Sequence, residues 1–232
     1  MIGIVAQAPD YLVLYKPHAM HTVPLKAGEG GTLLEEAASR FPEIALVHGK
    51  KNIEGGILHR LDFETEGLVL AARNEAAFQS LSRQQAEGLF VKEYDAVSSK
   101  QTLKPAGFPP FAASLPPAPF TIESAFRAYG PGRRAVRPVS EEKSKKTGAG
   151  KKYKTEVLSM SEGEGEGAEK KFHIRLTRGF RHQVRCHLAW LGFPIVNDPL
   201  YGGANIGGAL ALKAAYIQFF DPFSGEAREY RC

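Results

Sequence analysis

One carboxylate in the sequence is placed where it could act as a nucleophile. Asp62 lies two residues after Arg60 in the segment His59-Arg60-Leu61-Asp62, at a predicted corner between a strand and a loop. A neighbouring guanidinium favours the ionised form of an aspartate, which is the form a nucleophile requires. The same spacing fits a structural Arg–Asp pair, and such pairs are common and contribute little. Spacing alone therefore favours the structural interpretation.

Two further segments contain side chains of the types that catalytic sites use. Lys92 and Tyr94 alternate along a predicted strand, where a half-buried tyrosine is the ordinary interpretation. The second segment spans residues 179–188 and is followed by the motif Asn197-Asp198-Pro199-Leu200-Tyr201-Gly202. Its polar residues include Arg181, His182, Gln183 and Arg185.

Neither a metal site nor a nucleoside triphosphate site is predicted. Cys186 shares a helix face with His182, but His187 is turned about 100° away and no further ligand cluster follows. The segment 147–152 lacks the first glycine and the final Ser or Thr of a phosphate-binding loop. We therefore expect neither a metal ion nor a nucleoside triphosphate here.

Taken together, the ordered segments resemble the RNA pseudouridine synthases, in the branch that modifies large-subunit ribosomal RNA and tRNA and carries a His-Arg-Leu-Asp motif. The resemblance runs from Lys16-Pro17 to Ser224-Gly225 in the order of the family. It implies that Asp62 is the catalytic aspartate, Tyr94 the base-stacking tyrosine and Arg185 the buried arginine that pairs with the aspartate. Arg60 corresponds to the motif arginine near the flipped nucleotide. The expected substrate-binding residues are His59, Lys92, Arg181, His182 and Gln183.

Two positions depart from the family pattern near these residues. Glu66 stands where the family usually has Ser, and its carboxylate either perturbs the site around Asp62 or faces solvent. Phe180 occupies a position that is commonly Arg in the family, and Arg181 follows it as a candidate substitute.

The chemistry implied by the resemblance needs one carboxylate and a closed pocket, without a metal or a redox cofactor, so we expect no cofactor. Converting uridine to its C-glycoside isomer breaks the glycosidic bond, turns the base and rejoins it through carbon. Asp62 would attack C1′ or C6, or abstract a sugar proton. The target nucleotide must first leave the base stack, which costs free energy. Stacking of the displaced base on an aromatic side chain such as Tyr94 offsets part of that free energy.

Two other functions are compatible with the same residues. In the first, the chain is a non-catalytic RNA-binding or RNA-folding factor. It keeps the fold, but the altered residues Glu66 and Phe180 have removed its catalytic activity. A hydrolase that uses Asp62 and Glu64 as paired carboxylates is the weaker alternative, because the sequence leaves the separation of the two carboxyl groups unspecified.

The expected fold is α+β, formed by residues 1–232 as a single catalytic domain: a mixed, mostly antiparallel bent sheet with flanking helices and a central cleft. The family implies this fold, and the hydrophobic pattern is compatible with it. Prolines interrupt residues 105–119, which are expected to form an extended connection, and the charged stretches within 140–170 are expected to be flexible insertion loops. Strands are predicted at 11–15, 67–72, 90–97, 155–160, 171–177 and 214–220, and helices at 33–40, 75–87 and 181–191.

Composition restricts the partners and the compartment. The 232 residues have a formal net charge of +5, which permits RNA as a partner without requiring it. Two cysteines, the absence of a signal peptide and the absence of an apolar run of about 18 residues predict a cytoplasmic protein that does not span a membrane. A monomer is the default expectation.

Two features bear on how RNA would be held. The chain begins directly before its first predicted catalytic-domain strand at 11–15, so we expect no small N-terminal RNA-binding module. Six lysines between 143 and 154 either clamp RNA phosphates or form a solvated loop, and the sequence leaves both open.

Overall fold

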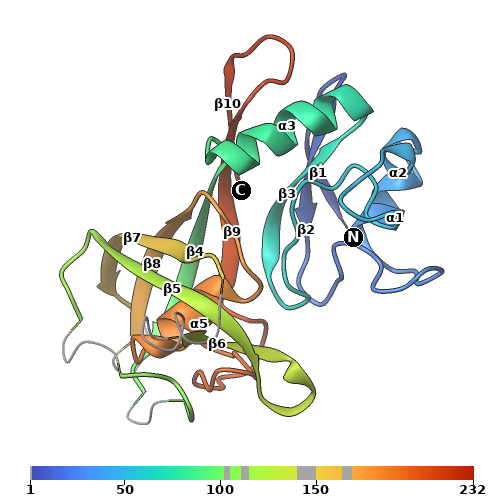
Figure 1. Cartoon of the computed structure of the whole chain (residues 1–232). Coiled ribbons are helices and arrows are strands. Elements are labelled where there is room, and N and C mark those ends of the chain that lie inside the picture. The colour runs from blue at the N-terminus through green and yellow to red at the C-terminus, as the bar shows by residue number, and fades with distance from the viewer. Residues whose placement is uncertain (1, 102–104, 111–114, 140–149, 164–168) are drawn as a thin grey trace. The chain divides into compact units, whose positions relative to one another are not determined.

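The computed structural model describes residues 2–101, 105–110, 115–139, 150–163 and 169–232. The chain forms two compact units, whose elements are labelled in Figure 1. Unit 1 comprises residues 1–92 and 213–232, and unit 2 comprises residues 93–212. The chain passes between them within β4 (Val91–Ser99) and at the start of β9 (Leu212–Phe220). That both units form one catalytic domain stays a prediction.

Unit 1 is built on a mixed sheet with the strand order β1-β2-β3-β9, and β10 pairs with the other part of β9. Its remaining strands are β1 (Gly3–Gln7), β2 (Tyr11–Lys16), β3 (Glu66–Ala72) and β10 (Ala227–Arg231). Neighbouring strands are antiparallel except for β3 and β9, which are parallel. Strands β2 and β3 are almost entirely buried because both are continuous apolar runs.

The helices of unit 1 begin where capping residues predict. In α1 (Leu33–Ala38), the Thr32 hydroxyl accepts a hydrogen bond from the Glu35 N–H. In α3 (Glu75–Glu87), Asn74 Oδ1 accepts the Ala77 N–H at 2.9 Å. The apolar face of α3 packs on a core that includes Tyr11, Val13, Leu68, Leu70, Phe90, Ile217 and Phe219. The helix predicted over 33–40 ends at residue 38, and a short α2 (Glu43–Leu46) follows Pro42.

Unit 2 has the strand order β4-β8-β7-β5-β6. The pairs β8/β7, β7/β5 and β5/β6 are antiparallel. Its elements are β5 (Phe120–Tyr129), the single 3-10 turn η1 (Pro131–Arg133), β6 (Ala135–Val139), β7 (Tyr153–Glu162), β8 (Glu169–Leu176) and α5 (Gln183–Trp190). Helix α5 packs against β6 and β7. A small core forms there from Ala135, Val136, Cys186, Ala189 and Tyr201.

The mixed, mostly antiparallel α+β fold is confirmed. No strand is predicted at 120–139, where the structure has β5 and β6. Pro138 obscured the second of these, because proline interrupts a strand pattern. Among the described strands β6 lies at the edge of the sheet and pairs with β5, and an edge strand tolerates proline. Strands β1 and β10 were also missed. Of the predicted loops at 140–170, residues 140–149 and 164–168 lie outside the described part, and 153–162 form β7.

The parallel contact between β3 and β9 requires glycine at position 67. Gly67 pairs with Ala214, and a Cβ at Gly67 would lie 2.3 Å from the Ala214 carbonyl oxygen. The φ of Gly67 is +124°, which also disfavours other residues. We expect Gly67→Ala to lower the free energy of unfolding by about 3 kcal/mol or more, from strain and overpacking together.

Gly28→Ala is the matched control. Gly28 has φ +81°, and a Cβ added there would meet no atom of the described residues within 4 Å. Urea unfolding of both variants checks the prediction. Gly28→Ala should cost only about 1–2 kcal/mol from its backbone conformation. Equal losses in the two variants would show that the close approach of the strands contributes nothing.

Candidate functional site

The loop that carries Asp62 leads into β3 and is fixed by a buried hydroxyl. The Thr22 hydroxyl accepts a hydrogen bond from the Leu61 N–H at 3.1 Å and donates to the Leu61 carbonyl at 3.0 Å. Asp62 itself is half-buried, and its carbonyl accepts the Thr65 N–H at 3.1 Å. Because Thr22 is shielded from water, the residue before the aspartate is held on both of its backbone polar groups.

A buried lysine joins this loop to the loop that follows β2. The Lys16 ammonium, fully buried, donates to three backbone carbonyls: those of Pro17 (2.9 Å), Met20 (2.8 Å) and Phe63 (3.4 Å). Burial lowers the pKa of Lys16 to about 8, against the opposing effect of three carboxylates, those of Asp62, Glu64 and Glu66. Lys16 thus provides a cation beside the carboxylates of the Asp62 loop.

Glu66 is engaged by a neighbouring strand. Its carboxylate hydrogen-bonds with the Tyr15 hydroxyl, and burial together with this bond raises the pKa of Tyr15 to about 12. The Glu66 charge also acts on Lys16. The departure from the family pattern at position 66 therefore places a half-buried, hydrogen-bonded carboxylate at the start of β3.

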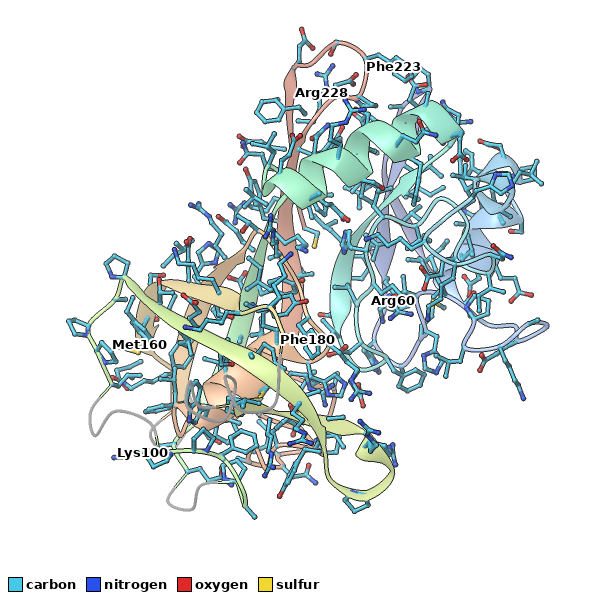
Figure 2. All side chains as sticks on the ribbon, viewed as in Figure 1. Arg60, Lys100, Met160, Phe180, Phe223 and Arg228 are labelled. Carbon is cyan, nitrogen blue, oxygen red and sulfur yellow. The ribbon has the colours of Figure 1, made fainter. Side chains whose placement is uncertain are left out.

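The Arg60 guanidinium pairs with Glu54, with Nη1 3.2 Å from Oε1. Glu54 is buried, whereas Arg60, labelled in Figure 2, is exposed. The structural Arg60–Asp62 pair that the spacing favoured is therefore replaced by a pair between Arg60 and Glu54. The Arg60 side chain keeps an exposed guanidinium next to the aspartate in sequence.

His59 is held as a neutral imidazole. The Leu70 N–H donates to His59 Nε2 at 3.2 Å, which places the ring proton on Nδ1. Burial, with the nearby charges of Lys92 and Lys50, lowers the pKa of His59 well below its usual value. Within the described residues, the buried Nδ1 has no hydrogen-bond partner. The His59 ring packs on Phe90, with centroids 5.1 Å apart.

Lys92 is a second buried cation, placed against an aromatic ring. Its ammonium lies 5.4 Å from the centroid of Phe90. Burial, with the charge of Lys50, lowers the pKa of Lys92 to about 8. No carboxylate or carbonyl in the described part of the chain contacts this ammonium, so its burial is compensated only by the ring.

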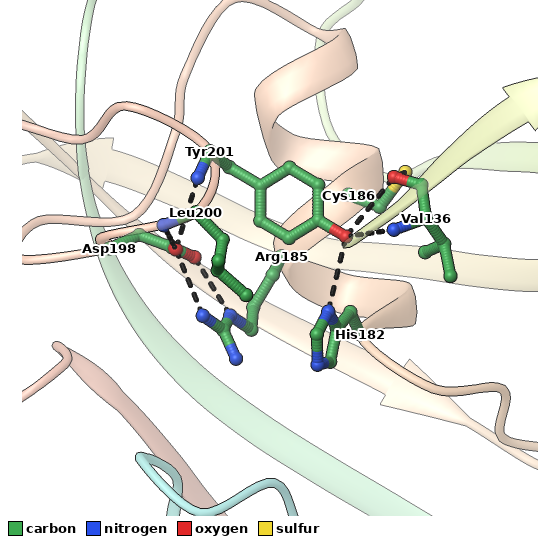
Figure 3. A network of polar contacts seen from close by, with 7 residues as sticks. All are labelled: Val136, His182, Arg185, Cys186, Asp198, Leu200 and Tyr201. Atoms are coloured by element: carbon green, nitrogen blue, oxygen red, sulfur yellow. Dashed lines mark hydrogen bonds and ion pairs between the residues drawn. The ribbon is translucent and has the colours of Figure 1, made fainter. Parts of the chain in front are cut away.

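In unit 2, the side chain of Arg185 is fully buried against Asp198 (Figure 3). Arg185 Nε donates to Oδ2 at 2.8 Å, and Nη2 donates to Oδ1 at 2.9 Å. The same Oδ1 accepts the N–H groups of Leu200 (2.9 Å) and Tyr201 (3.2 Å). The Asp198 carboxylate therefore both closes the turn that follows it and fixes the Arg185 guanidinium.

Tyr201 extends this network to β6 and to the start of α5. Its hydroxyl accepts the Val136 N–H at 2.9 Å, donates to the Val136 carbonyl at 3.1 Å and lies 3.2 Å from His182 Nδ1. The Tyr201 ring lies against the Arg185 guanidinium, 5.7 Å from its centroid. Figure 3 shows the ring between the ion pair and the Val136 backbone.

The predicted helix over 181–191 begins two residues later than expected. His182 has φ +55°, a left-handed conformation that cannot continue into a right-handed helix, so α5 starts at Gln183. Arg181 therefore lies outside the helix and shares no helix face with Arg185. Gln183 is buried, and its Nε2 donates to the Lys154 carbonyl (2.9 Å) and to Thr155 Oγ1 (3.0 Å).

The two aromatic positions singled out in the sequence differ in setting. Phe180, labelled in Figure 2, stacks on Phe126 with centroids 5.0 Å apart and an interplanar angle of 7°, so an apolar stack stands where the family commonly has Arg. Tyr94 lies on β4 in unit 2 and is 8% exposed. The roles predicted for Tyr94, His182, Gln183 and Arg181 stay predictions.

Four residues that hold candidate functional segments were missed from the sequence: Lys16 and Thr22 in unit 1, and Asp198 and Tyr201 in unit 2. In the sequence, Lys16 marked only the end of a predicted strand, and Asp198 was noted only as part of a loop motif. A turn-forming Asp and a lysine at a strand end are both ordinary patterns, so the sequence held no signal that set them apart.

Three predictions about binding concern other parts of the chain. Within the described ranges, no cluster of three His, Cys, Asp or Glu side chains is arranged to hold a metal ion. No helix of the described residues is long and apolar enough to cross a membrane. Of the six clustered lysines, three lie outside the described residues. Lys152 and Lys154 face Glu123 (3.8 Å) and Glu156 (2.8 Å).

The buried ion pair predicts a double-variant effect. Asp198→Asn leaves the Arg185 charge without its counter-ion and should lower the free energy of unfolding by about 3–5 kcal/mol. Replacing both partners, as Arg185→Met with Asp198→Leu, removes the buried charges together and should cost less than the single change. Urea denaturation of all three proteins measures this. A double variant less stable than Asp198→Asn would refute the assigned coupling.

The setting of Lys92 predicts a pH dependence. Its folded pKa lies below the unfolded value, so the unfolded chain binds more protons between about pH 8 and 10.5, and stability rises with pH over that window. Lys92→Met removes this contribution and should raise the free energy of unfolding at pH 7 by about 2 kcal/mol.

Urea unfolding of wild type and Lys92→Met at pH 7 and 9.5 tests this. The advantage of the variant should shrink at the higher pH, and Lys16, present in both proteins, cancels in the comparison. A variant that is less stable at pH 7 would show that the amine is paired in solution.

Comparison with known proteins places these residues in a family context. A profile described as RNA pseudouridylate synthase matches residues 10–190. The chain is 30% identical over 218 residues to an uncharacterized RNA pseudouridine synthase of Chloroflexus aurantiacus, covering 93% of this chain and 60% of that protein. It is 26% identical over 246 residues to ribosomal large subunit pseudouridine synthase D of Vibrio vulnificus, covering 99% and 66%. The chain thus spans about 60% of the length of the first of these relatives.

Two solved human structures share the fold. RNA pseudouridylate synthase domain containing 1 aligns with a TM-score of 0.70 at 24% identity, covering 100% of this chain and 83% of that one. RNA pseudouridylate synthase domain containing 4 aligns with a TM-score of 0.62 at 18% identity, covering 99% and 87%. Because the family profile extends over most of the sequence and includes Asp62, Tyr94 and Arg185, this chain belongs to the RNA pseudouridylate synthase family.

Proposed function

We propose that this protein is an RNA pseudouridine synthase that isomerises a specific uridine to pseudouridine. The observation that carries the proposal is the fixed position of Asp62. Its loop is held by the Thr22 hydroxyl and by the buried Lys16 ammonium, within the residues that the family profile matches. A carboxylate on a preorganised backbone is what covalent or proton-transfer chemistry at a sugar requires.

The proposed roles of the other residues follow the sequence analysis. Asp62 acts on the target nucleotide, and Tyr94 stacks on the displaced base. Arg185 is the electrostatic partner of the aspartate; its immobilisation by Asp198 supports this role, because a guanidinium fixed on two nitrogens needs no reorganisation during the reaction. Arg60 has an exposed guanidinium that suits contact with the target nucleotide.

His59 and Lys92 are proposed to support substrate binding rather than the chemical step. His59 is held neutral in unit 1, and its buried Nδ1 has no hydrogen-bond partner among the described residues. Lys92 lies buried against the Phe90 ring, and burial lowers its pKa to about 8. Buried groups of this kind cost stability, and such costs cluster at functional sites. His182, Gln183 and Arg181 are proposed to shape the segment in front of Arg185.

We propose a structured RNA as the substrate, with large-subunit ribosomal RNA placed first and tRNA second. The relative from Vibrio vulnificus is named for the ribosomal large subunit, which supports this order. A cytoplasmic monomer that needs no metal or cofactor completes the proposal.

The decisive experiment compares wild type, Asp62→Asn and Glu64→Gln on unmodified transcripts of large-subunit ribosomal RNA and tRNA. Pseudouridine is mapped by carbodiimide-dependent primer-extension stops. Asp62→Asn should lower the rate of isomerisation by at least about three orders of magnitude while RNA binding is retained. Glu64→Gln, a matched carboxylate two residues away, should keep the stop.

Each other outcome has a defined meaning. A stop that survives in Asp62→Asn would remove the aspartate from the reaction. Loss of the stop in both variants would favour paired carboxylates. If wild type binds both transcripts and total cellular RNA but modifies none of them, the chain is a non-catalytic RNA-binding factor and the proposed activity is wrong.

A further inference from the structure

The paired part of the β5–β6 hairpin carries a cluster of positive charge, and the one acidic residue of β5, Glu123, lies before it and pairs with Lys152 at 3.8 Å. Residues 124–139 contain four arginines and no acidic residue. Arg127, Arg133 and Arg134 are exposed. In the part of the chain that the structure describes, none of these three side chains has a carboxylate partner or another polar contact.

Three arginines outside the hairpin show how a carboxylate neutralises this side chain elsewhere in the fold. Arg73 pairs with Glu43 at 2.7 Å, and Arg175 pairs with the buried Glu93 at 2.7 Å. Arg228 pairs with Glu226 at 2.8 Å. The hairpin differs in that its exposed arginines are clustered within residues 124–139 without a carboxylate partner among the described residues.

Two of the hairpin arginines lie directly opposite each other. Arg127 on β5 is the register partner of Arg137 on β6. Like charges at directly opposed positions of an antiparallel pair are destabilising. Arg137 meets the ring of Tyr129 at 5.2 Å and donates to the Gly107 carbonyl at 3.0 Å, and neither contact cancels its charge. A bound anion would relieve this repulsion.

The tip of the hairpin is fixed to the rest of unit 2. Arg181 Nη2 donates to the Arg133 carbonyl at 2.9 Å and to the Ala135 carbonyl at 3.2 Å. Val136 is bound on both backbone groups by the Tyr201 hydroxyl, which belongs to the network around Arg185 (Figure 3). An anion held at the tip would therefore lie at a defined distance from Arg185.

We propose that the β5–β6 hairpin binds the phosphate backbone of the RNA substrate through Arg127, Arg133 and Arg134. The inference rests on the proposed function and adds to it a sequence-independent contact surface. Guanidinium groups suit phosphates because they offer several donors in a planar fork and remain charged at all working pH values. Such contacts fix the register of a nucleic acid, while the base is recognised elsewhere.

The test measures binding of a fluorescein-labelled, unmodified tRNA transcript to the full chain between 50 and 300 mM KCl. The variant Arg127→Gln/Arg133→Gln/Arg134→Gln should weaken binding at least tenfold at 100 mM KCl. The slope of log Kd against log salt should fall by about 2–3, because each lost phosphate contact removes about 0.7–0.9. The control Arg40→Gln/Lys51→Gln/Arg83→Gln removes the same charge from exposed positions of unit 1 and should change Kd less than twofold.

Charge-conserving substitution separates binding from folding. The variant Arg127→Lys/Arg133→Lys/Arg134→Lys should keep the salt slope of wild type, although its affinity falls. Unchanged binding by the glutamine variant, or an equal loss in the control, would overturn the proposal.

The readouts keep the two hypotheses distinct. A wild-type protein that forms pseudouridine while the glutamine variant binds normally disproves only the hairpin contact. A hairpin variant that binds weakly while wild type forms no pseudouridine disproves only the enzymatic activity.

Discussion

The buried ion pair between Arg185 and Asp198 is the interaction on which unit 2 depends. Each ion would cost several kcal/mol to bury alone, so neither side chain can occupy its place without the other. Asp198 also accepts the N–H groups of Leu200 and Tyr201, so the carboxylate that holds Arg185 of the helix also closes the turn that follows it. Tyr201 then connects this turn to Val136 on β6. One carboxylate thus joins a helix, a turn and a hairpin.

A buried ion pair is weak evidence for stability, because well-packed apolar residues of similar volume often perform as well. The contribution of this ion pair is to fix the position of the Arg185 side chain. The guanidinium of Arg185 is held by two hydrogen bonds and a ring face, and its orientation is settled before any ligand arrives. Unit 1 uses the same device with an amine: Lys16 binds carbonyls from two loops and thereby sets the path of the chain that carries Asp62.

The sequence was informative where short-range rules apply. Asn74 marked the start of α3, and the alternating pattern identified β4 and β8, because caps and strand alternation are local properties. The residues that contact the candidate functional side chains could not be predicted, because those contacts join distant parts of the sequence. Thr22 and Leu61 are 39 positions apart, and Val136 and Tyr201 are 65 apart, and nothing local marks either contact. His182 was misread because its left-handed backbone is fixed by tertiary contacts and not by its residue type.

The net charge of the chain says little about RNA binding, whereas the distribution of charge over its surface indicates where RNA would bind. Subtracting the four arginines of residues 124–139 from the formal net charge of +5 leaves +1 for all other residues. Interactions between exposed charges fade beyond about 8 Å at physiological salt, so a polyanion responds to the local surface and not to the total. Under the proposed contact, a chain of modest net charge therefore binds RNA at one hairpin. Because Val136 of that hairpin is bound through Tyr201 to the network of Arg185, the proposed phosphate contact and the buried arginine belong to one connected network within unit 2.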